Sequence, residues 1–88
     1  MIYKFNKEQY QLCKKYVIQV YEGDMAEIKM HDESKSIEVT AEGLDAFTDA
    51  ADYAIIHFGM INQDYLTDLG YKLQFLYDEI YAQTIAEQ

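Results

Sequence analysis

The stretch that decides the fold is Asn62–Ala86, NQDYLTDLGYKLQFLYDEIYAQTIA, the last third of the chain. Apolar residues recur in it at spacings of three and four, which places them on one stripe of an α-helix. The members of this stripe are Leu66, Leu69, Leu73, Leu76 and Ile80. A second apolar stripe, on another side of the same helix, consists of Tyr71, Phe75, Ala82 and Ile85. A surface helix needs only one such stripe, so the second predicts a helix that is central to its domain or shared with a partner.

The segment before it has the same helical period. Apolar residues recur at three and four from Leu44 to Phe58, which predicts a helix over about 41–58, with Thr40 as its N-cap and Gly59 ending it. Asn62 then caps the last helix, over about 63–86. The short connection predicts an antiparallel αα-hairpin. A turn centred near Met60 would bring Gly70 opposite Ala51.

Residues 16–40 favour strands. Apolar and polar residues alternate over about 25–31 and 36–40, and matching their apolar faces pairs Met30 with Ile37 and Ile28 with Val39. The run 16–22 is almost wholly β-branched and aromatic, which favours a third strand. Together these segments predict a three-stranded antiparallel meander.

The start of the chain predicts a short helix. Asn6 is a suitable N-cap and Gln9 completes a capping box. The expected fold class is therefore α+β: this helix, the meander and the αα-hairpin packed together as one domain over residues 1–88. In the alternative, the N-terminal helix is continuous to residue 22 and one β-hairpin follows it.

The charge bears most on partners. Sixteen acids against seven lysines, with no arginine, give a net charge of −9. Because phosphate contacts need clustered Lys and Arg, direct binding to nucleic acid or to an anionic membrane is disfavoured. A basic protein partner is compatible with this charge, and so is a role in solubility alone. Residues 22–68 are the acidic part, with twelve acids against two lysines.

The residues of enzyme sites are sparse. Cys13 is the one cysteine, and His31 and His57 are the two histidines. No ligand spacing for a metal, no glycine-rich phosphate loop and no nucleophile motif is present, which predicts no enzyme, no cofactor and no metal. The lone cysteine and the lack of an apolar leader segment or a long apolar run predict a cytoplasmic protein.

One row of acids is the candidate partner-binding site. Glu42, Asp45, Asp49 and Asp52 fall on one face of the second predicted helix, which contains no lysine to pair with them. At about 1.5 Å of rise per residue, their spacing of about 4.5–6 Å approaches a phosphate repeat. Asp64 and Asp68 add charge at the start of the last helix. An ordinary solvated helix face is the competing interpretation.

Tyrosine is the second feature, with nine in the chain. Tyr65, Tyr71, Tyr77 and Tyr81 point several ways around the last helix, and tyrosine is common at protein interfaces. The candidate interface for a partner or for a homodimer consists of Tyr71, Phe75, Tyr77 and Tyr81.

Two functions follow from these features. In the first, the chain is a phage-type acidic inhibitor that occupies a basic site on a nucleic-acid-binding protein such as a nuclease, with carboxylates in the places of phosphates. In size, charge and lack of catalytic residues it is similar to small phage-encoded inhibitors of restriction or CRISPR nucleases, although no motif is shared. In the second, it is a homo-oligomeric structural or regulatory domain that uses the last helix as its interface.

Overall fold

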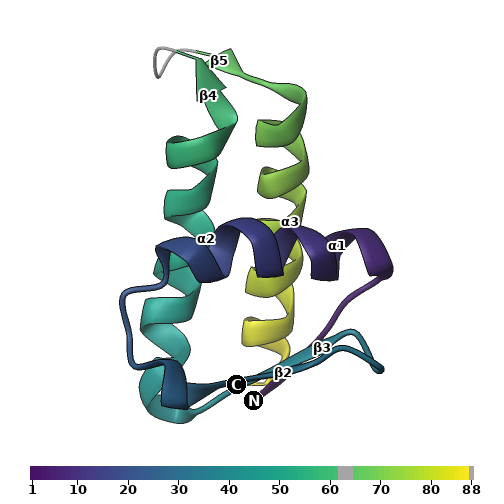
Figure 1. Cartoon of the computed structure of the whole chain (residues 1–88), viewed down its shortest axis with the longest axis vertical. Coiled ribbons are helices and arrows are strands. Elements are labelled where there is room, and N and C mark those ends of the chain that lie inside the picture. Colours follow the sequence, from purple (N-terminus) through teal and green to yellow (C-terminus); the bar gives the residue numbers. More distant parts are fainter. Residues whose placement is uncertain (62–64, 88) are drawn as a thin grey trace.

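The computed structural model describes residues 1–61 and 65–87. Its longest elements are α2 (Leu44–Gly59) and α3 (Asp68–Ala86), which pack against each other as an antiparallel αα-hairpin (Figure 1). Three members of the predicted leucine stripe, Leu73, Leu76 and Ile80, are buried in the core together with Phe47 and Ala54 of α2. Leu69 is partly buried at the start of α3, and Leu66 precedes the helix. The predicted hairpin is therefore confirmed.

The start of α2 and the connection between the two helices differ from the prediction, and the connection is longer than expected. Thr40 caps a short 3₁₀ turn, η4 (Ala41–Gly43), from which α2 continues. After α2, β4 (Met60–Ile61) pairs antiparallel with β5 (Tyr65–Leu66). The last helix then begins at Asp68, not near residue 63, because the Thr67 hydroxyl accepts a hydrogen bond from the Gly70 N–H at 3.0 Å and caps it. The expected cap, Asn62, lies outside the described residues.

Gly70 does allow the two helices to pack closely. The residue opposite it is Gly59, so the prediction that Ala51 lies opposite Gly70 was wrong. The Gly59 carbonyl accepts hydrogen bonds from the Thr67 N–H at 2.8 Å and the Thr67 hydroxyl at 3.1 Å. These bonds fix the ends of the connection, so the two glycines meet where α2 ends and α3 begins.

The sheet contains β1 (Ile2–Lys4), β2 (Ile28–His31) and β3 (Ser36–Val39), in the order β1-β3-β2 with antiparallel neighbours. The predicted pairs Met30 with Ile37 and Ile28 with Val39 are both confirmed. The second strand begins at residue 28, not 25, because Asp24 and Glu27 form a capping box around a 3₁₀ turn, η3 (Met25–Glu27).

The third strand comes from a different segment than expected. Residues 16–22 form no strand; the helix that Asn6 and Gln9 begin, α1 (Lys7–Leu12), continues through π-helical η1 (Cys13–Val17) and 3₁₀ η2 (Ile18–Val20). Burial of Tyr10, Cys13 and Val17 on one side of this segment outweighs its β propensity. This agrees with the alternative of a continuous helix, while the β1 lead-in provides the third strand.

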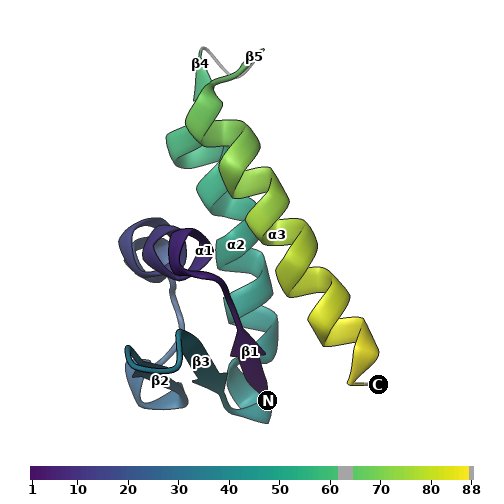
Figure 2. The same ribbon diagram turned by 90° about the vertical axis from the view of Figure 1, so that its right-hand side faces the viewer.

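The elements form an α+β arrangement around one buried cluster that extends from Tyr3 to Ile80. Figure 2 shows the N-terminal helical segment and the sheet on one side of the αα-hairpin. At the far end of α3, the Gln83 side chain accepts from the Lys4 N–H at 2.9 Å and donates to the Lys4 carbonyl at 2.7 Å. Among the described helices, none is long and apolar enough to cross a membrane.

Candidate functional site

The predicted acid row is exposed along one side of the first half of the hairpin. Asp45, Asp49 and Asp52 are exposed on α2, and Glu42 is exposed on η4 just before it. We call these four residues the acidic face. Its position follows from helical periodicity, because Phe47, Ala51 and Ala54 bury the opposite side of α2 in the core.

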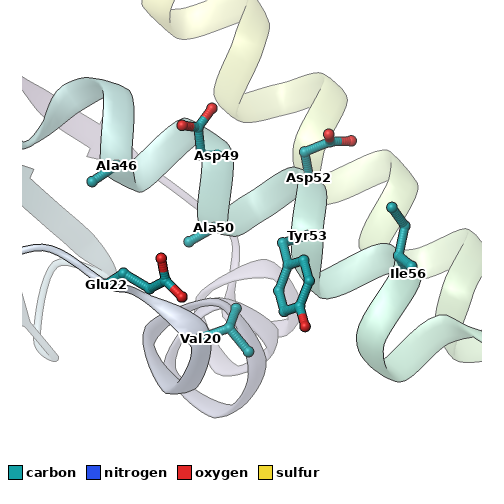
Figure 3. Close-up of a pocket in the computed structure, with 8 residues that line it drawn as sticks. All are labelled: Val20, Glu22, Ala46, Asp49, Ala50, Asp52, Tyr53 and Ile56. Atoms are coloured by element: carbon teal, nitrogen blue, oxygen red, sulfur yellow. The ribbon is translucent and has the colours of Figure 1, made fainter.

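The acidic face borders an open groove of about 480 Å³ between α2 and the end of η2 (Figure 3). The floor of this acidic groove is apolar and consists of Val20, Ala46, Ala50, Tyr53 and Ile56. Its charged rim is formed by Glu22, Asp49 and Asp52. Glu22 approaches from the N-terminal segment, whereas Asp49 and Asp52 extend from α2, so acids come from both walls (Figure 3).

Tyr21 fixes the wall that carries Val20 and Glu22. Tyr21 is buried, with 9% of the residue exposed, and its hydroxyl donates to Glu27 Oε1 at 2.9 Å. Burial, and then the hydrogen bond to the Glu27 carboxylate, raise the pKa of Tyr21 to about 12. The hydroxyl therefore stays protonated over the physiological range and continues to donate.

Among the described residues, no cationic side chain forms an ion pair with the carboxylates of the site. Within residues 1–61 and 65–87, the ion pairs are Lys14–Asp32 at 3.0 Å, His31–Glu38 at 3.4 Å and Lys72–Glu8 at 3.8 Å. All three pairs lie outside the acidic face and the acidic groove. Because like charges three or four residues apart on a helix repel each other, we expect the acidic face to lower the stability of the free protein slightly.

Of the other two predicted acids, Asp68 does not join this face. Asp68 is exposed in the first turn of α3, where a carboxylate suits the helix dipole. Because α3 runs antiparallel to α2 (Figure 1), the first turn of α3 lies near the C-terminal end of α2, whereas Glu42 precedes the N-terminal end of α2. Asp64 lies outside the described residues.

The predicted tyrosine surface is largely exposed. Tyr71, Phe75, Tyr81 and Ile85 are 50–67% exposed along α3, and we call them the α3 outer face. Tyr77 differs, because it is half-buried against the core and its ring lies 6.2 Å from the ring of Tyr81.

Several groove residues were absent from the sequence prediction. Tyr53 and Ile56 are 50% and 48% exposed on the acid-bearing side of α2. Large apolar residues outside the buried stripe of this helix could have been recognised from the sequence as surface residues. Ala46 and Ala50, one turn apart, mark the hollow. Val20 and Glu22 could not be assigned to the groove, because the residues around them had been predicted as a strand.

The titratable groups elsewhere have structural surroundings. Cys13 is fully buried, and that burial raises the pKa of its thiol, which opposes nucleophilic use. Tyr10 donates to Asp32 Oδ1 at 2.5 Å, and Lys14 donates to the same oxygen at 3.0 Å. In the described part of the chain, no three His, Cys, Asp or Glu side chains are grouped so that they would hold a metal ion.

Comparisons with protein-family models, with curated proteins and with solved structures give no match to this chain. The acidic face, the acidic groove and the α3 outer face are therefore the features of the molecule that bear on its function.

Proposed function

We propose that this chain is a non-enzymatic protein-interaction module that occupies a basic site on a nucleic-acid-binding protein such as a nuclease. The acidic face makes the contact, and its carboxylates take the places of phosphates. The lone buried Cys13 also suits the reducing cytoplasm in which such a partner would be met.

One observation carries this proposal: the four carboxylates of the acidic face are exposed in a row, and within the described residues none forms an ion pair. A row of unpaired like charges disfavours the free helix, whereas a cationic surface would convert the repulsion into attraction. The net charge of −9 would also speed the approach of a basic partner.

The test is retention of nucleic-acid-binding proteins from extracts of the source cell on immobilised wild-type protein, at low and high salt. We expect salt to weaken retention and added DNA to displace the retained protein. The variant D45N/D49N/D52N should retain little. E8Q/E33Q/E87Q is its control, because it loses the same charge at exposed sites away from the acidic face. Equal retention by both variants would exclude the acidic face as the binding surface.

A second proposal is self-association through the α3 outer face. Four large side chains at least half exposed along one helix favour it, since isolated monomers seldom leave such a stripe uncovered. Light scattering at high micromolar concentration tests it. A dimer that F75S converts to a monomer would support this interface, and a strictly monomeric wild type would remove it.

A further inference from the structure

We propose that the acidic groove binds a short basic amphipathic helix of the partner, which inserts an apolar side chain between flanking Arg or Lys residues. This inference rests on the proposed function, because the groove shares Asp49 and Asp52 with the acidic face. It adds the kind of segment that is recognised.

The floor of the groove requires an apolar component in the occupant. Ala46 and Ala50 lie one turn apart on α2, and their small side chains leave a hollow facing Val20. Tyr53 and Ile56 leave about half of their surface in water beside it. A surface that copied only the charges of a nucleic-acid backbone would have no use for this apolar floor. Covering it removes apolar area from water and favours binding.

The rim requires cations around that apolar side chain. Glu22 on one wall and Asp49 and Asp52 on the other form no ion pair with any described residue. Arginine suits this rim best, because its guanidinium can bind a carboxylate with two hydrogen bonds and can stack on the Tyr53 ring.

The spacing of the rim favours a helical occupant. Asp49 and Asp52 are three residues apart on α2, so they are separated by about 4.5 Å along its axis. Basic residues three or four apart on a partner helix share one face and have nearly the same separation, whereas neighbours on one face of a strand lie about 6.6 Å apart. A volume of about 480 Å³ accommodates a few side chains of such a helix.

Calorimetric titration of the full chain with two synthetic peptides tests the proposal. The first is a helix of about four turns with arginines three and four residues apart around a central leucine pair, and the second has serines in place of the leucines. We expect wild-type protein to bind the leucine peptide at least about tenfold more tightly than the serine peptide.

The variants separate this proposal from the proposed function. A46F fills the hollow, so it should abolish the preference for the leucine peptide while binding of the arginines remains. I56S removes apolar area from the floor at an exposed position and should weaken the same preference. It replaces A46F as the test if A46F does not fold. A82F is the control, because Ala82 is exposed on α3. Equal affinity of wild type for both peptides, with D49N/D52N still weakening both, would overturn the groove proposal alone. No effect of D49N/D52N on either peptide would overturn the proposed function as well.

Discussion

The backbones of Gly59 and Gly70 are in direct contact where α2 and α3 diverge from their connection. A Cβ added to Gly59 would lie 2.5 Å from the Gly70 Cα, and one added to Gly70 would overlap the Gly59 carbonyl oxygen. That oxygen also accepts two hydrogen bonds from Thr67, so it cannot move away freely. The crossing of the hairpin therefore depends on the absence of both side chains.

Replacing Gly70 with alanine tests this contact. In an exposed helix the change would add about 1 kcal/mol of stability, but here we expect G70A to lower the free energy of unfolding by about 1–3 kcal/mol, because the helices must separate. Urea denaturation measures the difference. The control is A82G, at an exposed position of the same helix, which should cost only about 1 kcal/mol. A more stable G70A protein would refute the backbone contact.

The contact between Gly59 and Gly70 also shows which parts of the fold can be predicted from the sequence. The helical period predicted α2, α3 and the close approach at Gly70, but the partner of Gly70 depends on the connection. That connection contains β4, β5 and the Thr67 cap, which have short and weak local signals. The prediction of a strand over residues 16–22 was wrong for a related reason. The β propensity of these residues is a local property, whereas the burial of Val17 depends on the whole fold.

The candidate site likewise has one part that could be predicted from the sequence and one part that could not. Exposure of Asp45, Asp49 and Asp52 on one side of α2 follows from periodicity and could be predicted. The acidic groove could not, because its second wall is contributed by Val20 and Glu22 from a distant part of the chain.

Gln83 closes the outer edge of β1 much as a neighbouring strand would, through its two hydrogen bonds with Lys4. Replacing Gln83 with methionine keeps its length and removes both bonds, together with the bond that the same amide donates to Glu79 Oε2 at 2.8 Å. We expect Q83M to lower the free energy of unfolding by about 1 kcal/mol, since water replaces these exposed bonds in part. Q74M is the matched control, because among the described residues the Gln74 amide donates only to Asp78 Oδ1, at 3.5 Å. Equal stability of the two variants in urea would contradict a role for Gln83 at the strand edge.

The contact between Tyr10 and Asp32 makes stability depend on pH in acid. The Tyr10 hydroxyl, and next to it Lys14, stabilise the ionised carboxylate and hold the pKa of Asp32 below its ordinary value. A lowered native pKa adds stability above the unfolded value of about 3.9, and this is lost as the pH falls through the native pKa. Y10F should therefore flatten the acid side of a plot of Tm against pH. An identical slope for Y10F and wild type below about pH 4 would exclude this linkage.

The acidic face should cost the free protein stability. Asp49 repels Asp45 and Asp52 along one helix face, and none of the three forms an ion pair with a described residue. We expect D49N/D52N to raise the free energy of unfolding by a few tenths of a kcal/mol at low salt, and the gain to shrink with added salt. Thermal denaturation at two salt concentrations measures both effects. A loss above about 1 kcal/mol would indicate that these acids support the fold.

The proposal that the acidic face and the acidic groove form the binding surface is tested most directly by locating the residues that a bound peptide contacts. Isotope-labelled protein titrated with the arginine and leucine peptide, and followed by NMR chemical shifts, reports every backbone amide. We expect the shifts to concentrate on α2 from Asp45 to Ile56 and on Val20 and Glu22, and we expect D45N/D49N/D52N to remove them. Shifts spread over acids throughout the chain, or centred on Tyr71 and Phe75 of α3, would contradict the proposal.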